Sequence, residues 1–240
     1  MKRYLICIPT YNESESIEEL LHRFGALLTK DYSLEILVID DNSPDGTANI
    51  VDNVDISKPL HLLRRSRKEG LGPAYIAGFT WGLSRSFDFF VECDADGSHQ
   101  PEELDRLIDA SRNSDLVIGT RWMPQGEVVN WPLLRRIISK TGTFYAQKAL
   151  GLPFKDLTSG YRIYSAKALE SLNFTDIATQ GYGFQIEMAM RVFDKGLRIT
   201  EVPITFVERQ QGRSKMSRRI VLEALVQTTK WGAQRRFKWK

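Results

Sequence analysis

Short apolar segments alternate with amphipathic segments along the first half of the chain. The apolar segments are rich in Val, Ile, Leu and Phe, which is typical of strands that are buried on both faces. Strands separated by helices predict an α/β fold, with a mostly parallel sheet and helices on both of its faces. The expected strands are 3–9, 34–40, 60–63, 87–93 and 115–119, and the expected helices are 14–29, 44–53, 71–85 and 101–112.

The second half is less regular, and no segment in it resembles a linker between domains. We therefore assign residues 1–212 to one catalytic domain and residues 213–240 to a basic, amphipathic C-terminal helix that faces a membrane. The expected helices are 132–150, 183–195 and 216–233, and the expected strands are 159–165 and 197–204.

Polar residues directly follow four of the expected strands. The first strand leads into PTYNE at 9–13, the second into DDNSPDG at 40–46, the fourth into DADGS at 94–98 and the fifth into GTR at 119–121. The carboxyl ends of parallel strands meet at one edge of a sheet, where ligands bind. The sequence therefore predicts one site that combines acidic, aromatic and basic side chains.

The loop after the first strand excludes a nucleotide-dependent dehydrogenase. That class needs a G-x-G-x-x-G turn whose amides hold a pyrophosphate, and the segment PTYNESES contains no glycine. A Walker loop is also missing, and the three histidines have no metal-ligand spacing. Cys7 and Cys93 lie within apolar strand-like runs, so we expect buried thiols in a reducing compartment.

Asp94 and Asp96 are the most informative pair of residues in the chain. Two carboxylates at this spacing just after a strand can turn toward one ligand, and their oxygens suit Mg²⁺ or Mn²⁺. Such a metal stabilises a departing diphosphate. A lone D-x-D is also compatible with a solvated loop, but the neighbouring motifs favour the metal site.

The ordered segments PTYNE, DDNSPDG, DADGSHQP, GTR and RQQGRSK resemble those of the inverting family 2 glycosyltransferases, which have the GT-A fold. The segments GEVVNWPLLRRIIS, DLTSGYRIY and QIEM are similar, more narrowly, to those of dolichol-phosphate and polyprenol-phosphate mannose synthases. The resemblance covers nearly the whole chain. It implies transfer of mannose from GDP-mannose to a polyprenyl phosphate, with Mg²⁺ or Mn²⁺ as cofactor and a β-linked product.

The resemblance also implies roles for the matching positions. Tyr11 would pack against the base, Glu13 would accept a hydrogen bond from it, and Asp96 would be the direct metal ligand. Ser98 would be a third metal contact, although some members have Gln there and a serine reaches less far. The implied donor-binding residues are Pro9, Tyr11, Glu13, Ile39, Asp41, Asp94, Ala95, Asp96, Arg121, Arg209 and Lys215; Asp94, Asp96, Arg121 and Arg209 form the implied catalytic set, and Arg135 and Ser139 are candidates for the acceptor phosphate.

Structural roles remain open for several of these residues. Glu13 could cap the helix that follows it, and Arg121 and Arg209 could be surface charges. Trp131 is expected to pack in the interior, and Glu187 could be structural or could position the sugar.

A phosphate acceptor would simplify the chemistry of transfer. A sugar hydroxyl usually needs a general base, whereas a phosphate monoester is already anionic at neutral pH. The protein then has to align the reactants and neutralise charge, which Arg side chains do well. The absence of an evident catalytic histidine fits this chemistry.

Positive charge is concentrated near the C-terminus. Residues 209–240 hold ten Lys or Arg and one acid, a net charge of +9, whereas the other 208 residues have a net charge of −6. This asymmetry predicts contact with phosphates or lipid headgroups, and the interspersed apolar residues favour a membrane surface. The alternative is a helix that closes the domain and carries a solvated basic tail.

No segment has the length and apolarity of a membrane-spanning helix. We therefore expect a peripheral protein on the cytoplasmic face of a membrane, with a membrane-anchoring subunit as an alternative means of attachment.

Two rival functions remain open at this point. A polyprenyl-phosphate glucosyltransferase or N-acetylglucosaminyltransferase would use a UDP-sugar on the same fold. A binding protein for anionic lipid or nucleic acid would use the basic tail without turnover. No nucleic-acid-binding motif is recognisable, so no nucleic-acid partner is expected.

Overall fold

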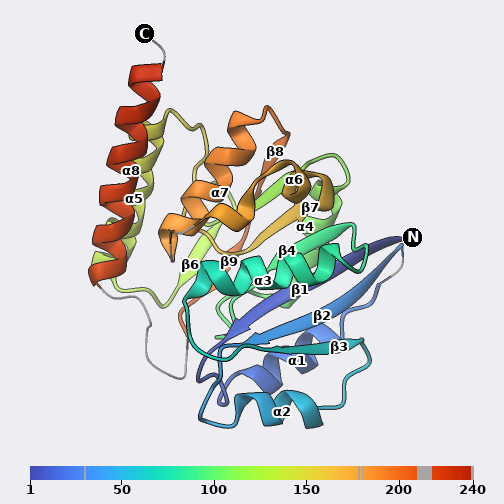
Figure 1. Cartoon of the computed structure of the whole chain (residues 1–240). Coiled ribbons are helices and arrows are strands. Elements are labelled where there is room, and N and C mark those ends of the chain that lie inside the picture. The colour runs from blue at the N-terminus through green and yellow to red at the C-terminus, as the bar shows by residue number, and fades with distance from the viewer. Residues whose placement is uncertain (30, 178, 180, 210–217, 239–240) are drawn as a thin grey trace.

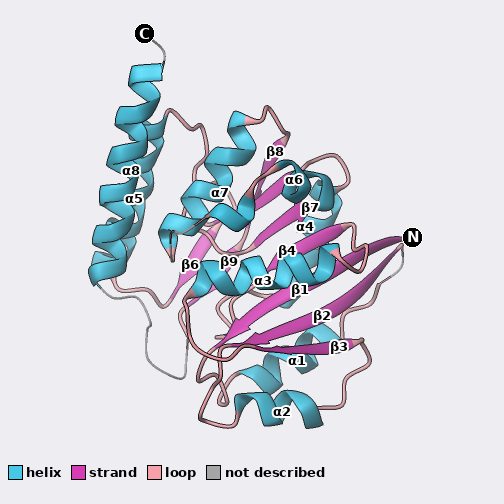
Figure 2. Cartoon of the chain, in the orientation of Figure 1, coloured by secondary structure: helices cyan, strands magenta, loops and turns pink. Residues whose placement is uncertain are grey.

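The computed structural model describes residues 1–29, 31–177, 179, 181–209 and 218–238. A sheet of seven strands lies at the centre of the molecule, with helices around it (Figures 1 and 2). The strand order is β3-β2-β1-β4-β7-β5-β8, and β7 alone runs antiparallel to its neighbours in this sheet. The strands are β1 Lys2–Thr10, β2 Tyr32–Asp40, β3 Leu60–Arg64, β4 Phe89–Glu92, β5 Leu116–Thr120, β7 Arg162–Ser165 and β8 Ile199–Pro203.

Helices cover both faces of this sheet and bury a separate hydrophobic cluster on each (Figure 2). On one face lie α1 Ile17–Gly25, α2 Thr47–Asn53 and α4 Leu104–Ser111, which follows the short 3₁₀ helix η1 Pro101–Glu103. On the other lie α3 Leu71–Leu83, α6 Ala166–Ser171, the 3₁₀ helix η2 Phe174–Asp176 and α7 Tyr182–Asp194.

Strand β1 shows why the apolar runs of the sequence are continuous. Successive side chains of a strand point to opposite faces of the sheet. Tyr4, Ile6 and Ile8 enter one hydrophobic cluster, and Leu5 and Cys7 enter the other. Because both faces are covered, every position of the strand interior is apolar.

Two long helices, α5 Leu133–Leu150 and α8 Arg218–Lys238, pack side by side at one end of the molecule (Figure 1). Gly232 permits a close approach, because a Cβ there would lie 2.6 Å from the Ala149 carbonyl oxygen. The Tyr145 hydroxyl lies 2.6 Å from that of Thr229, and α8 also contacts α7. The C-terminal helix is therefore packed against the rest of the molecule.

The predicted elements are confirmed, with corrections to their bounds. The first helix begins at Ile17 rather than 14, because the Glu13 carbonyl accepts hydrogen bonds from the amides of Ser16 and Ile17 in a preceding turn. The expected strand 159–165 is the shorter, antiparallel β7. A parallel pair, β6 Glu127–Val129 and β9 Thr205–Val207, was not predicted. The domain boundary at 212–213 falls outside the described residues and stays a prediction.

Candidate active site

Most of the predicted site residues line one pocket at the carboxyl edge of the sheet. We call it the strand-edge pocket. It lies beyond the ends of β1, β2, β4 and β5, as expected for a parallel sheet. It is lined by Pro9, Thr10, Tyr11, Glu13, Asp41, Lys68, Gly70, Leu71, Ala74, Asp94, Ala95, Asp96, Arg121, Trp131, Arg135, Thr158, Gly160, Gly181, Tyr182, Gln185, Phe206 and Arg209.

Three of the predicted residues that the structure describes do not line this pocket. The Ile39 side chain is fully buried in the core, and a Cβ added at Gly78 of α3 would lie 2.8 Å from its Cδ1 atom. Ser98 is only 2% exposed and is not among the lining residues of the described pocket. Ser139 lines a neighbouring groove, and Lys215 lies outside the described residues.

Asp94 and Asp96 project into the pocket from the loop after β4. Gly97 has a positive φ of 72°, which lets the chain turn back so that the Ser98 amide donates to Asp96 Oδ1 at 3.0 Å. A Cβ at Gly160 would lie 3.6 Å from both Asp94 carboxylate oxygens, so a glycine keeps space beside them.

This carboxylate pair fits a hard divalent cation. Carboxylate oxygens are the ligands that Mg²⁺ and Mn²⁺ prefer, and these ions are commonly shared between one or two carboxylates and substrate phosphates. Among the described residues there is no cluster of three or more Cys, His, Asp or Glu side chains that could hold a metal. Such ions commonly take their remaining ligands from substrate phosphates and water.

His99 supports Asp94 from the buried side. The Asp94 amide donates to His99 Nδ1 at 3.1 Å, which leaves the proton of the neutral ring on Nε2. Nε2 lies 3.9 Å from Asp94 Oδ2. Burial lowers the pKa of His99 to about 4, so the ring is neutral at physiological pH. His99 was not predicted as a site residue, because the histidines were tested only for the spacing of metal ligands.

Aromatic and charged side chains meet at the end of the pocket formed by β1 and β2. The Lys68 ammonium lies 4.1 Å from the centroid of the Tyr11 ring. Asp41 accepts a hydrogen bond from the Arg65 guanidinium at 2.6 Å and one from the Glu69 amide at 3.3 Å. Lys68 was not predicted, because it lies in the irregular segment between β3 and α3.

Glu13 reaches the same end of the pocket. The amides at the start of α1 bind its backbone carbonyl, and α1 has no side-chain cap at Ser16. The Glu13 carboxylate accepts the Ser16 hydroxyl at 3.3 Å. Glu13 therefore contacts the start of α1 through its backbone carbonyl and through the Ser16 hydroxyl.

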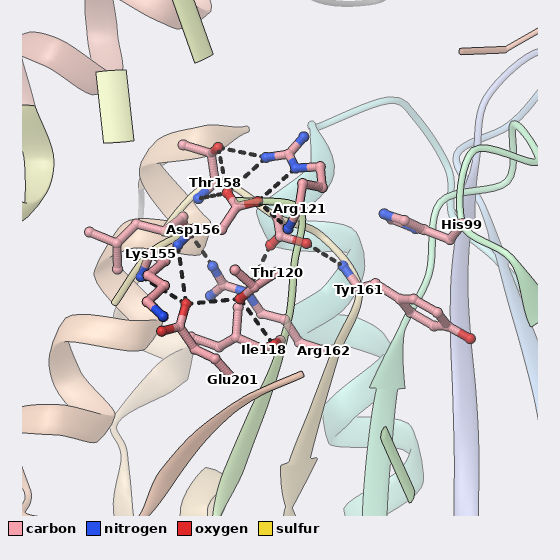
Figure 3. A network of polar contacts seen from close by, with 12 residues as sticks. His99, Ile118, Thr120, Arg121, Lys155, Asp156, Thr158, Tyr161, Arg162 and Glu201 are labelled. Atoms are coloured by element: carbon pink, nitrogen blue, oxygen red, sulfur yellow. Dashed lines mark hydrogen bonds and ion pairs between the residues drawn. The ribbon is translucent and has the colours of Figure 1, made fainter. Parts of the chain in front are cut away.

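Arg121 is a buried residue and not a surface charge, because it is only 4% exposed. Its Nε and Nη2 atoms donate to the two carboxylate oxygens of Asp156 at 2.7 and 2.8 Å, and Nη2 also donates to Thr158 at 2.9 Å (Figure 3). Asp156 is itself fully buried. This bidentate pair fixes the direction of the guanidinium at the pocket wall.

Arg209 and Arg135 bring further positive charge to the pocket. Arg209 pairs with Asp96 Oδ2 at 2.5 Å, and its side chain is only 18% exposed, so it is not a surface charge either. Arg135 pairs with Glu208 and lies 4.1 Å from the centroid of the Trp131 ring. Trp131 is buried against Val128 and Phe206, which confirms its packing role. 

Glu187 has structural partners. The Thr179 hydroxyl donates to it at 2.7 Å, and Arg191, one helical turn later, pairs with it at 2.6 Å. These contacts favour the structural alternative over a direct role with the sugar.

A second cavity, which we call the α5–α8 groove, adjoins the strand-edge pocket and is lined mainly by the two long helices. The two share Trp131, Arg135, Thr158 and Tyr182 in their linings. The lining of the groove is Trp131, Pro132, Leu134, Arg135, Ile138, Ser139, Gly142, Tyr145, Ala146, Thr158, Tyr182, Ile186, Val221, Ala224, Leu225 and Thr228, most of it apolar.

Glu92 is fully buried beneath the pocket, and neither carboxylate oxygen has a hydrogen-bond partner among the described residues. Burial raises the pKa of Glu92 to about 8, although the charge of Arg162 on the neighbouring strand and the nearby Gln185 side chain oppose this shift. The folded protein therefore binds a proton that the unfolded chain releases near its ordinary pKa of 4.5. The free energy of unfolding should fall as pH rises from that value through about 8.

Glu92→Gln should remove this pH dependence, because glutamine stays neutral. Melting temperatures measured with EDTA at about pH 5 and about pH 8.5 should fall by several degrees more for the wild type than for E92Q. An equal fall in both proteins would mean that Glu92 is ionised throughout and paired with Arg162.

A mostly parallel sheet, with two aspartates after a central strand and basic residues around the same pocket, is the architecture of a GT-A glycosyltransferase. Residues 5–172 match the model of Glycosyl transferase family 2, and the chain belongs to this family.

Its relatives give the same classification. An undecaprenyl-phosphate mannosyltransferase of Micrococcus luteus is 50% identical over 236 residues, covering 98% of this chain and 96% of that protein. A polyprenol monophosphomannose synthase of Mycolicibacterium smegmatis is 44% identical over 238 residues, covering 98% and 89%.

A solved structure shares the fold at lower sequence identity. Glucosyl-3-phosphoglycerate synthase from Mycobacterium tuberculosis, in complex with Mn²⁺, UDP-glucose and phosphoglyceric acid, superimposes with a TM-score of 0.68 at 20% identity. The match covers 95% of this chain and 80% of that one.

Proposed function

We propose that the protein transfers mannose from GDP-mannose to a polyprenyl phosphate at a membrane surface, with inversion at the anomeric carbon. The observation that carries this proposal is that two unlike cavities lie side by side and share four lining residues. A pocket with paired aspartates and arginines suits a nucleotide sugar, and it adjoins a mostly apolar groove that suits an isoprenoid chain. The names of the two relatives above support the same donor sugar and acceptor class.

The donor would lie with its base near Tyr11, Glu13 and Asp41 and its diphosphate near Asp94 and Asp96. A divalent metal bound by these two aspartates would neutralise charge on the departing diphosphate. Arg209 already lies against Asp96 and would contact the same phosphates. Pro9 and Ala95 would contribute pocket walls, and Lys215 remains a predicted phosphate contact.

The acceptor phosphate would lie where the groove meets the pocket. Arg135 lines both cavities and Ser139 follows one turn later on α5, so a guanidinium and a hydroxyl face the same region. An anionic phosphate oxygen would attack the anomeric carbon while the carbon–oxygen bond to the donor diphosphate breaks. No general base is needed, and the protein contributes alignment and charge neutralisation.

Membrane attachment would use both long helices rather than the C-terminal helix alone. Apolar side chains are exposed on α5 and α8, beginning with Leu133, which is 72% exposed. No helix in the described part of the chain is long and apolar enough to span a bilayer. An apolar surface beside basic residues favours binding at an anionic interface. The exposed apolar residues are Leu133, Leu134, Ile137, Ile138, Phe144 and Tyr145 of α5 and Leu222, Leu225 and Val226 of α8.

Leu133→Asp and Ile137→Asp should each weaken binding to anionic phospholipid vesicles about tenfold. Each removes apolar area that the bilayer would bury, and each adds a negative charge that the anionic lipids repel. Cosedimentation measures this, and neither residue lines the groove. Leu28→Asp, at an 83% exposed position after α1, is the matched control. Equal vesicle binding by all three variants and the wild type would contradict this docking surface.

The donor assignment is tested by equilibrium binding of GDP-mannose and UDP-glucose in the presence of Mg²⁺ or Mn²⁺. The proposal predicts clearly tighter binding of GDP-mannose. Tighter binding of UDP-glucose would replace the donor by a UDP-sugar while leaving the family and the acceptor proposal in place.

A further inference from the structure

Tyr182 lies at the junction of the strand-edge pocket and the α5–α8 groove. The proposed function places the donor in one cavity and the acceptor chain in the other, and the present inference rests on it. Residues that line both cavities then surround the point where the acceptor phosphate meets the anomeric carbon. Only Trp131, Arg135, Thr158 and Tyr182 are shared by these two described linings.

The hydroxyl of Thr158 is committed to the wall of the pocket. It donates to Asp156 Oδ1 at 3.2 Å and accepts from Arg121 at 2.9 Å (Figure 3). A threonine hydroxyl has one proton to donate, so Thr158 has none left for a substrate in this arrangement. Its role is to help hold Arg121.

The Tyr182 hydroxyl lies among charges of both signs. Burial raises its pKa and Asp94 and Asp156 add to this rise, whereas the charges of Arg121 and Arg135 oppose it. The phenol therefore keeps its proton at neutral pH. Tyr182 is also the first residue of α7, a 13-residue helix whose N-terminus favours a negative ligand.

We infer that the Tyr182 hydroxyl donates a hydrogen bond to a phosphate oxygen of the acceptor and holds that phosphate in line with the anomeric carbon. A second phosphate oxygen forms the new bond to that carbon, and the bond from the carbon to the donor's β-phosphate oxygen breaks. The electron pair leaves with the nucleoside diphosphate. Tyr182 keeps its proton throughout, so its contribution is to bind and orient.

Tyr182→Phe tests this inference, because it removes the hydroxyl and keeps the ring. Transfer to a short polyprenyl phosphate should show a fall in kcat/KM for the acceptor of about tenfold to a hundredfold, typical of losing a hydrogen bond to a charged group. Binding of GDP-mannose and its slow hydrolysis by water should stay within about twofold of wild type, because water brings no phosphate.

Tyr4→Phe is the matched control. It removes a buried hydroxyl, which lies 2.8 Å from that of Ser111, from the end of β1 opposite the pocket. Its transfer activity should equal that of the wild type. Equal transfer by Y182F and the wild type would overturn this inference and leave the proposed function in place. An equal loss of donor hydrolysis and lipid transfer in Y182F would do the same. A wild-type protein without transfer to polyprenyl phosphate would overturn the proposed acceptor, and this inference with it.

Discussion

Asp96→Asn should lower metal-dependent transfer by about a hundredfold to a thousandfold, because metal coordination contributes several kcal/mol to stabilising the departing diphosphate. An amide has the size of the carboxylate but lacks its charge, so it binds Mg²⁺ or Mn²⁺ weakly. Asp96 faces the pocket, and its side chain is only 7% exposed. Initial rates with saturating donor and a metal titration measure the effect.

The matched control is Asp109→Asn, at an exposed position on α4 whose carboxylate pairs only with Arg112 among the described residues. It should keep the wild-type rate. Both variants should melt within a few degrees of the wild type, which separates loss of metal from loss of fold. Unchanged turnover of D96N with Mg²⁺ and Mn²⁺ would show that Asp96 does not hold the metal.

Arg209→Ala should lower kcat/KM for the donor by about a hundredfold. The guanidinium is held at the pocket by Asp96, so it is already placed near the proposed diphosphate. Removing one preorganised donor from a site where charge develops typically costs between about a hundredfold and a thousandfold in rate. Steady-state kinetics with varied GDP-mannose measure this loss.

Arg236→Ala is the comparison that separates a positioned arginine from bulk positive charge. Arg236 is exposed on α8, and its replacement removes the same charge from the C-terminal segment. Its kcat/KM for the donor should stay within about twofold of wild type. Equal losses in both variants would mean that the basic residues act only through their summed charge.

The sequence predicts the first half of the fold well because local pattern and tertiary environment agree there. In β1 the run of apolar residues already implies burial on both faces. The same reasoning places Asp94 and Asp96 at the ligand-binding edge, because they directly follow the strand β4. Burial of Cys7 and Cys93 is likewise confirmed.

Features that depend on distant contacts could not be predicted. The apolar pattern of a strand does not specify whether the strand runs parallel or antiparallel to its neighbours. Nothing in the segment 159–165 therefore indicated that β7 is antiparallel. Strands β6 and β9 have three residues each, which is too short to show an apolar pattern, and they pair although they lie far apart in the sequence. The buried ion pair between Arg121 and Asp156 could not be predicted either, nor could the groove that forms where α8 packs on α5.

The most direct test is transfer of radiolabelled mannose from GDP-mannose to a short polyprenyl phosphate, with Mg²⁺ or Mn²⁺ and with EDTA. The proposed function predicts label in the lipid fraction with either metal or both, and its loss with EDTA. No label in the lipid fraction with any metal, from a protein that binds GDP-mannose, would contradict the proposed acceptor and the role of the α5–α8 groove.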